Sequence, residues 1–292
     1  MKPRDIIEYI ALALIWGFSF LVLLRVVEAF GWVGAVTFRC FIAGGTLLVV
    51  ATVLRRRLDF KAGWRPFLIV GATTVAGQLI GLSYATPLIG TAMAAIFVAA
   101  IPLFSMVIGQ LWGLETITAQ KLAGLVLGTV GILLLVGFPA VPVTTSFVLG
   151  CIGSLVSGLF AAFGSNYASR SLRGVGSWEV TIGSFLFGGL LTLPLLFFVP
   201  VPTVPRALDY LYLVVAGAGM SALTYVIYFR LVGAIGATRT ISVEFAVTVV
   251  AVLVGAFWLG EELSLIQILG AATIIGGCML VLGLMPLRSR AA

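Results

Sequence analysis

The sequence predicts an all-α integral membrane protein of ten transmembrane helices, built as two inverted five-helix repeats. Hydrophobic residues make up 61% of the 292 residues and charged residues only 9%, whereas soluble domains carry about 25% charged residues. The chain also contains one stretch twice, because residues 90–137 align without a gap on residues 236–283 when 146, half the chain length, is added to each number. A repeat of this length indicates one structural unit written twice.

The repeat is defined by residues that are identical at the offset of 146. The segment Trp112-Gly-Leu-Glu115 aligns with Trp258-Leu-Gly-Glu261. Other identical pairs in this stretch include Gly90 and Gly236, Ala100 and Ala246, Gly124 and Gly270, Gly131 and Gly277, Leu134 and Leu280, and Gly137 and Gly283. Outside the stretch the offset still pairs Trp32 with Trp178 and Ser19 with Ser165. We therefore expect two repeats, residues 1–146 and 147–292.

The expected helices follow from the charge-free stretches. Residues 66–114 and 122–169 contain no Asp, Glu, Lys or Arg, and a crossing needs roughly 20 residues, so each stretch holds two helices and a turn. The turns are expected at Tyr84–Pro87 and Pro139–Pro142, and the first apolar run is expected to remain as a helix because no cleavage site follows it. The predicted helices span residues 6–27, 32–54, 65–84, 88–111, 118–137, 146–169, 178–199, 207–230, 236–259 and 264–286.

The distribution of basic residues predicts the orientation. If the N-terminus is cytoplasmic, the outer segments hold only Arg25 and Arg206. The inner segments then hold Lys2, Arg4, Arg55, Arg56, Arg57, Lys61, Arg65, Lys121, Arg170, Arg173, Arg230, Arg239, Arg288 and Arg290. This asymmetry places both termini in the cytoplasm. It also accounts for the net charge of +7 through loops that face an anionic leaflet, without a nucleic-acid partner.

Five helices per repeat is an odd number, so the second repeat enters the membrane upside down relative to the first. Inverted repeats are a recurrent plan of secondary transporters, with the substrate near the membrane midplane between the halves. The chain has no His, the commonest metal ligand, and we expect neither a metal site nor a cofactor. An oligomeric partner is not expected to be required.

Two charged residues lie inside predicted helices, Arg39 and Glu244. Counting along the helices places Arg39 roughly 7 Å outward of the midplane and Glu244 roughly 5 Å inward, so the two are not expected to touch. A charge at such depth is a functional candidate. Arg39 could equally clamp helix-end carbonyls, and Glu244 could be held protonated by burial. Glu115 and Glu261, each close before a Thr or Ser, are interpreted as helix caps.

Several short motifs resemble a known family. They are Trp16-Gly-Phe-Ser-Phe20, Arg39 after Phe38, Pro102, and the duplicated Trp-x-x-Glu pattern with its glycines. Over essentially the whole chain the sequence resembles the EamA-type drug/metabolite transporter superfamily, and within it most resembles the YddG exporters of bacteria. The resemblance implies export of aromatic and other neutral amino acids across the bacterial inner membrane by alternating access. One departure is Val243-Glu244-Phe245, where such proteins often read Leu-Glu-Pro.

An aromatic amino acid needs an apolar, aromatic-lined chamber with a few polar groups. Gln78 and Thr224 are equivalent in the two repeats and are expected to line the path together. The full set of candidates is Trp16, Gln78, Tyr84, Thr224, Tyr225, Tyr228 and Ser242. For Tyr84, a place in the aromatic belt at the membrane surface is the alternative.

Other functions stay open at this point. The substrate could be another small metabolite or a drug of the same superfamily. An integral membrane enzyme acting on lipid is also conceivable, but it would need acidic residues or His clustered at one bilayer face, and the chain lacks such a set. A receptor or scaffold without transport is the third alternative.

Overall fold

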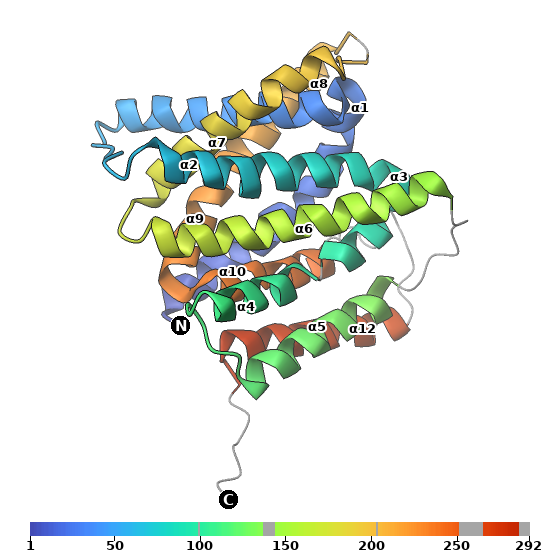
Figure 1. Ribbon diagram of the computed structural model, residues 1–292. Coiled ribbons are helices and arrows are strands. Elements are labelled where there is room, and N and C mark those ends of the chain that lie inside the picture. The colour runs from blue at the N-terminus through green and yellow to red at the C-terminus, as the bar shows by residue number, and fades with distance from the viewer. Residues whose placement is uncertain (99, 137–143, 203, 251–264, 286–292) are drawn as a thin grey trace, which may run out of the picture.

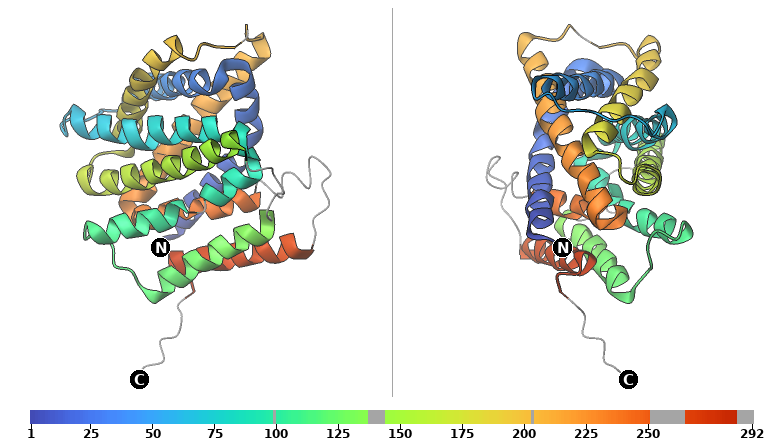
Figure 2. Two further views of the ribbon diagram at one scale, coloured as in Figure 1. Left: turned by 45° about the vertical axis from the view of Figure 1, so that its right-hand side comes forward. Right: turned by 90° about the vertical axis from the view of Figure 1, so that its left-hand side faces the viewer.

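The computed structural model describes residues 1–98, 100–136, 144–202, 204–250 and 265–285, and every regular element in this part of the chain is a helix. The helices lie side by side in one bundle (Figures 1 and 2). The α-helices are α1 (Pro3–Val53), α2 (Trp64–Val70), α3 (Gln78–Val98), α4 (Ile101–Leu111), α5 (Ala119–Val136), α6 (Thr145–Ser171), α7 (Ser177–Thr192), α8 (Ala207–Val214), α9 (Thr224–Ile235), α10 (Ala237–Ile241) and α12 (Leu265–Leu282). Two π-helices, η1 (Gly71–Gly77) and η3 (Val215–Leu223), and a 3-10 helix, η2 (Leu193–Phe197), continue some of them. Residues 243–250 are also helical.

Five helical stretches of the described chain are long and apolar enough to cross a membrane. They are Val22–Val53, Trp64–Ile89, Thr145–Ser171, Ser177–Phe197 and Ala207–Ile235. The prediction of an all-helical, membrane-embedded chain is therefore confirmed.

The first two predicted helices are joined in the structure. Helix α1 runs from Pro3 to Val53 and bends at Gly31, whose φ of 72° and ψ of 166° are not helical. A positive φ costs glycine little because it has no Cβ. The bend therefore falls between the predicted helices 6–27 and 32–54.

The predicted turn at Tyr84–Pro87 is wrong. Helix α3 passes through Pro87 and continues to Val98, and the next helix, α4, begins at Ile101. Proline is tolerated inside membrane helices where neighbouring groups satisfy the freed backbone, and the Thr86 hydroxyl donates a hydrogen bond to the Leu82 carbonyl one turn back. The second predicted turn, Pro139–Pro142, lies outside the described residues, as do Trp258 and Glu261.

The repeats differ at Gly90 and Gly236, equivalent glycines near the start of the fourth predicted helix of each half. Helix α9 ends at Ile235 and Gly236 adopts a φ of 89°, so the chain breaks there as predicted. The equivalent Gly90 is helical inside α3. Sequence identity at this offset therefore did not guarantee the same backbone, and Pro87, which is Gly233 in the second half, did not produce a break in the first.

Helices α5 and α12 form a close pair at one end of the bundle (Figure 1). Their bounds, 119–136 and 265–282, differ by 146 at both ends. A Cβ on Gly124 would lie 2.8 Å from the Gly277 carbonyl oxygen, and a Cβ on Gly131 would lie 2.9 Å from the Gly270 carbonyl oxygen. The residue numbers rise along one helix as they fall along the other, so the two equivalent helices are antiparallel. Glycine brings them into backbone contact, as small residues do between membrane helices.

The two π-helices are also equivalent. Adding 146 to the bounds of η1 gives residues 217–223, which lie within η3 and share its last residue. Each π-helix ends directly before one of the equivalent polar candidates, Gln78 and Thr224. π-Helical turns occur often at functional sites, and the sequence patterns did not predict them.

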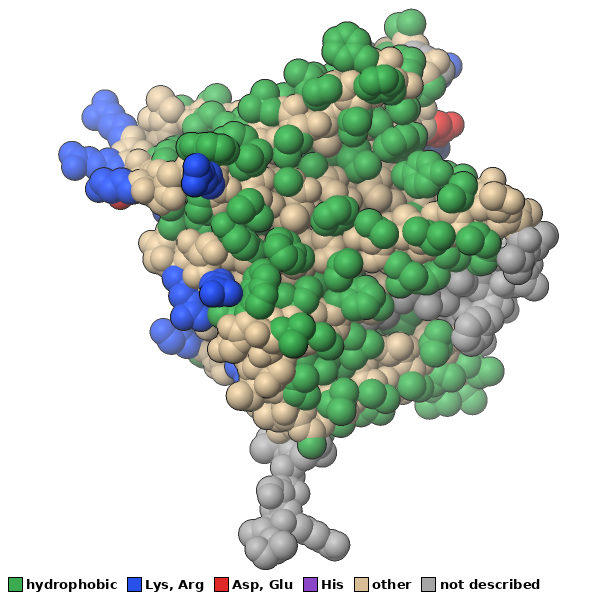
Figure 3. Space-filling view, viewed as in Figure 1, with side chains coloured by type: hydrophobic (Ala, Val, Ile, Leu, Met, Phe, Trp, Pro, Cys, Tyr) green, Lys and Arg blue, Asp and Glu red, His purple; other side chains and the backbone are tan. Residues whose placement is uncertain are grey.

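Lys and Arg side chains gather along one edge of the molecule (Figure 3). This edge carries the connection between α1 and α2 and the turn between α6 and α7. We call it the basic edge. Ion pairs between Arg230 and the first turns of α1 also join distant parts of the chain.

Candidate functional site

Four of the predicted site residues lie together in the core. The Trp16 ring on α1 lies 5.5 Å from Tyr225 and 5.6 Å from Tyr228 on α9, measured between ring centroids. The Trp16 Nε1–H donates a hydrogen bond of 2.9 Å to Thr224 Oγ1. All four side chains are buried. The contact joins residues that are 208 positions apart in the chain, so it ties the first half to the second.

The start of α9 explains why Thr224 can accept this bond. The Thr224 hydroxyl donates its only proton to the Met220 carbonyl in η3, which leaves an oxygen lone pair for the indole. Tyr225 and Tyr228 follow at helical spacing and reach the same face. Removing either partner would leave a buried donor or acceptor unpaired, at a cost of about 1–3 kcal/mol.

Two rings that sequence reasoning missed complete this aromatic cluster, which comprises Trp16, Phe185, Tyr225, Tyr228 and Phe229. Phe185 on α7 lies 4.8 Å from Tyr225, and Phe229 lies 5.4 Å from Tyr228. Phe185 is equivalent to Arg39 at the offset of 146, but no other feature of the sequence distinguishes it from its apolar neighbours.

The Tyr228 hydroxyl is held by Ser165 on α6. Ser165 donates its proton to the Ala161 carbonyl, so the tyrosine must donate to the serine. Both groups are buried. The aromatic cluster thus combines aromatic rings with hydroxyl groups held in fixed orientations by hydrogen bonds.

Arg39 lies next to the aromatic cluster, close to Tyr225. Its Nε–H donates to Ser221 Oγ in η3, and Ser221 in turn donates to the Ala216 carbonyl. Arg39 is buried and lies close enough to Tyr225 for electrostatic interaction. It therefore anchors the π-helix that precedes Thr224, in keeping with the predicted clamp alternative.

Glu244 also lies close to the cluster, and Ser242 precedes it by two residues. Glu244 is half-buried and close enough to Tyr9, Tyr225 and Tyr228 for electrostatic interaction. Ser242 donates to the Arg239 carbonyl and accepts from the Tyr9 hydroxyl at 3.0 Å. Within the described residues, Arg39 and Glu244 form no ion pair with each other, as the depth estimate predicted.

Gln78 and Tyr84 are not part of the aromatic cluster. Tyr84 stacks edge-on against Trp32 with centroids 5.4 Å apart, and Trp32 lies one residue beyond the bend of α1. Gln78 is half-buried at the start of α3, and its carbonyl accepts a hydrogen bond from Ser157. The expected meeting of Gln78 with Thr224 is not among the contacts of the described residues.

Ion pairs join α9 to the start of α1. Arg230 at the end of α9 pairs with Asp5 at 2.8 Å and with Glu8, both in the first turns of α1. The hydrogen bond from Arg230 holds the pKa of the Asp5 carboxyl below its ordinary value of 3.8 because it stabilises the charged form. These pairs join the first half to the second one to two turns from the Tyr9–Ser242 contact.

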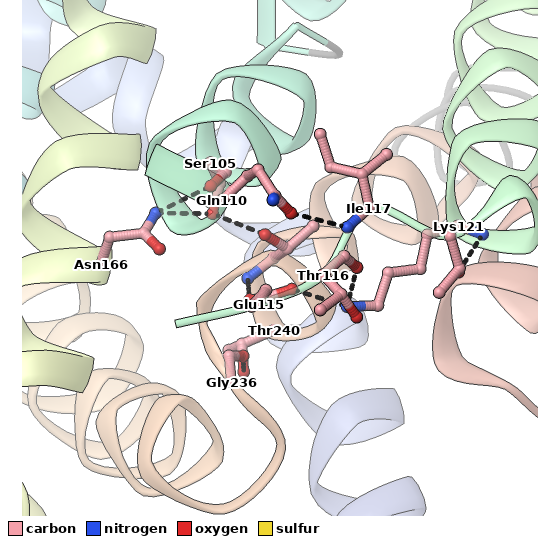
Figure 4. Close-up of polar contacts among 11 residues, drawn as sticks. Ser105, Gln110, Glu115, Thr116, Ile117, Lys121, Asn166, Gly236 and Thr240 are labelled. Carbon is pink, nitrogen blue, oxygen red and sulfur yellow. Dashed lines mark hydrogen bonds and ion pairs between the residues drawn. The ribbon is translucent and has the colours of Figure 1, made fainter. Parts of the chain in front are cut away.

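Glu115 joins the same two halves (Figure 4). Its Oε1 accepts the backbone N–H of Thr238 in the first turn of α10 at 3.1 Å, and its Oε2 pairs with Lys121 at 2.9 Å. Glu115 thus caps a helix, but the helix is α10 rather than the following α5, where the backbone N–H of Lys121 donates instead to the Thr118 hydroxyl. Beside it, Asn166 of α6 donates to Ser105 of α4, as the close-up also shows.

The fold and this buried cluster between distant helices define a polytopic helical membrane protein. Comparison with known proteins gives the class: a model of the EamA-like transporter family matches residues 6–137 and again residues 148–283. The chain belongs to this family and is a membrane transporter.

The relatives agree with this family. The chain is 28% identical over 287 residues to the uncharacterized inner membrane transporter YedA of Escherichia coli, covering 93% of this chain and 88% of YedA. It is 22% identical over 271 residues to the uncharacterized transporter YoaV of Bacillus subtilis, covering 92% of this chain and 93% of YoaV. Protein PecM of Dickeya dadantii is 25% identical over 288 residues, covering 96% and 92% of the two chains. A crystal structure superposes with a TM-score of 0.82 at 18% identity, over 98% of this chain and 100% of the other, and so shares the fold.

Proposed function

We propose that this chain is a secondary transporter that exports aromatic and other neutral amino acids across the bacterial inner membrane by alternating access, with both termini in the cytoplasm. The observation that carries the proposal is the buried aromatic cluster, in which Trp16 of the first half bonds to Thr224 of the second half. The relative YedA, whose name places it in an inner membrane, supports the location.

The division into two inverted repeats, residues 1–146 and 147–292, is part of this proposal. The antiparallel pairing of α5 with its equivalent α12 supports it, and so do the equivalent π-helices η1 and η3. The family model also matches once in each half. In transporters with inverted repeats the substrate binds near the midplane between the halves, and the aromatic cluster joins helices of both.

The substrate class follows from the chemistry of the cluster and from the resemblance to the YddG exporters. Indole and phenol rings offer faces for an aromatic side chain, and each stacked pair is worth about 0.5–1.5 kcal/mol beyond burial. The hydroxyls of Thr224, Tyr228 and Ser242 and the amide of Gln78 would orient the zwitterion. Arg39 and Glu244 both lie close to Tyr225 of the cluster, and Tyr84 would contact the substrate farther along the path.

Transport by the purified protein tests the proposal. In liposomes we expect flux of labelled Phe, Trp, Tyr, Met or Thr above that of empty vesicles. Absence of flux for all five would contradict the amino-acid assignment, and flux of an unrelated metabolite or drug would replace it.

The site is tested with variants at matched membrane abundance. Trp16→Ala should weaken affinity roughly three- to tenfold, because one stacking ring is lost. Thr224→Val and Gln78→Leu should change which amino acids pass, because a polar group of the substrate loses its partner. Trp112→Ala, which removes an indole stacked 5.2 Å from Phe163 outside the cluster, is the matched control. Unchanged rates and preference in all three site variants would place the path elsewhere.

A further inference from the structure

A second candidate site lies outside the aromatic cluster, at the basic edge. A groove of about 510 Å³ runs between α1, α2 and α7. Its walls are apolar and include Phe60, Trp64, Phe67, Ile182, Leu186 and Leu190. Trp64 and Leu190 are 58% and 54% exposed, so the groove opens to the surface of the bundle. None of its lining residues belongs to the proposed transport path.

The groove ends where the basic residues of the α1–α2 connection lie. Residues 55–65 hold five cations, Arg55, Arg56, Arg57, Lys61 and Arg65, against one carboxylate, Asp59. Asp59 pairs with Lys61 at 3.2 Å. Among the described carboxylates, none forms an ion pair with Arg56 or Arg65. Lys and Arg side chains lie beside hydrophobic side chains at the basic edge (Figure 3).

Two of these guanidiniums are held on the helices that wall the groove. Arg65 lies 5.7 Å from the ring centroid of Trp64, at the start of α2. Arg56 lies 4.9 Å from the ring centroid of Trp178, in α7 one turn before the lining residue Ile182. Stacking on an aromatic face fixes a guanidinium in place and leaves its N–H groups free to donate. The structure thus combines an apolar groove with two guanidiniums stacked on aromatic rings of the helices that form its walls.

We propose that this groove binds an anionic phospholipid, with one acyl chain between α1, α2 and α7 and the phosphate between Arg56 and Arg65. An acyl chain gains from burial against apolar walls. Guanidinium is the side chain best suited to a phosphate, because its fork can donate two parallel hydrogen bonds. Basic residues next to a membrane span recognise anionic headgroups by the same charge. The site is a lipid site on the outside of the bundle and does not depend on the transported substrate.

Lipid binding by the purified protein tests this proposal. Native mass spectrometry in detergent would compare phosphatidylglycerol with phosphatidylcholine of the same acyl chains. We expect wild-type protein to retain phosphatidylglycerol in preference. Arg56→Gln with Arg65→Gln should weaken phosphatidylglycerol binding about 25-fold, at about fivefold per charge, and should leave phosphatidylcholine binding unchanged. Leu190→Trp, which narrows the groove, should weaken the binding of both lipids.

The matched control removes two cations from the same edge. Arg170 stacks 5.7 Å from the Trp112 ring, as Arg65 does on Trp64, but it lies away from the groove, and Arg173 follows it one turn later. Arg170→Gln with Arg173→Gln should leave phosphatidylglycerol binding within about twofold of wild type. Equal binding of the two lipids by wild type, an equal loss in both double variants, or displacement of the lipid by millimolar inorganic phosphate alone would overturn the proposal.

Discussion

At the scale of single residues, buried polar groups in this bundle are fixed by helix carbonyls and hydroxyls. Arg39 is the clearest case, because its Nε–H reaches Ser221 and Ser221 reaches the Ala216 carbonyl. An ionised side chain inside a membrane protein is costly unless it faces protein or water. The position of Arg39 therefore indicates that it stabilises η3 and, through it, the start of α9.

Ser221→Ala tests this role of Arg39. Because the substitution leaves a buried guanidinium without its partner, we expect a loss of about 1–3 kcal/mol, measured as a lower midpoint of thermal unfolding in detergent. Thr248→Ala is the control, since among the described residues its hydroxyl donates to a carbonyl of its own helix, that of Glu244. If Ser221→Ala keeps the wild-type midpoint while Arg39→Met loses transport, Arg39 contacts substrate instead.

The ion pair of Asp5 predicts that the stability of the folded protein depends on pH. Its folded-state pKa is depressed by the hydrogen bond from Arg230, so its contribution to stability is present above the unfolded value of 3.8 and is lost as the pH falls through the folded value. We expect Asp5→Asn to unfold at a lower temperature than wild type at pH 7, with the difference shrinking below about pH 4. Thermal unfolding between pH 7 and pH 3 measures it. A difference that stays constant over this range would contradict the ion pair.

At the scale of elements, glycine decides how closely helices pack. A Cβ on Gly277 would lie 2.7 Å from the backbone oxygen of Gly124 and 2.7 Å from the backbone nitrogen of Gly128. Backbone atoms cannot turn away as a flexible side chain can, so α5 and α12 would have to separate. The neighbouring Gly276 has no atom within 4 Å of such a Cβ.

These two glycines form a matched pair of substitutions. Gly277→Ala should destabilise the protein by about 1–3 kcal/mol through overpacking. Gly276→Ala should be neutral or stabilise by up to about 1 kcal/mol, because alanine favours the helix. Thermal unfolding of both variants in the same detergent provides the comparison. Similar effects of the two substitutions would show that α5 and α12 do not rely on this contact.

At the scale of the whole molecule, apolar patterning predicted the helices well. In lipid the backbone must satisfy its own hydrogen bonds, which favours helices. Long charge-free stretches therefore predict helices directly. The patterns failed where the local rule depends on context: Pro87 usually marks a helix end, yet α3 passes through it. The polar and aromatic residues of apolar helices also pointed to the site, since Trp16, Thr224, Tyr225 and Tyr228 meet.

Other parts of the site could not be read from the sequence. Gln78 and Thr224 are equivalent at the offset of 146, but depth in the membrane does not fix the direction in which a side chain points, and among the described residues no hydrogen bond joins the two. Phe185 looked like any apolar residue until the structure brought it to Tyr225. The π-helices depend on packing between helices. Gly71 in η1, for example, lies against the backbone of Ser184 and Gly188 in α7. No local sequence pattern predicts such a contact.

The basic edge gives a prediction of orientation for the whole chain. Reporters fused after Ala292 and within residues 55–65 should both report cytoplasm, because Lys and Arg near membrane spans are retained inside. A reporter between Pro139 and Thr145 should report the outside. Opposite signals from the two cytoplasmic probes would contradict an even number of crossings between them, and outside signals from both would reverse the orientation.

The pairing of α5 with α12 also bears on how the chain arose. Gly124 meets Gly277 and Gly131 meets Gly270, and the offset of 146 exchanges these two pairs. A surface that contacts its own equivalent in this way is self-complementary, as in a twofold dimer. We infer that the ancestor was a half-length polypeptide that assembled as an antiparallel homodimer before its gene was duplicated and fused. If so, residues 1–146 and 147–292 expressed as separate polypeptides should co-purify and regain transport. Failure of the two halves to associate would contradict a homodimeric ancestor.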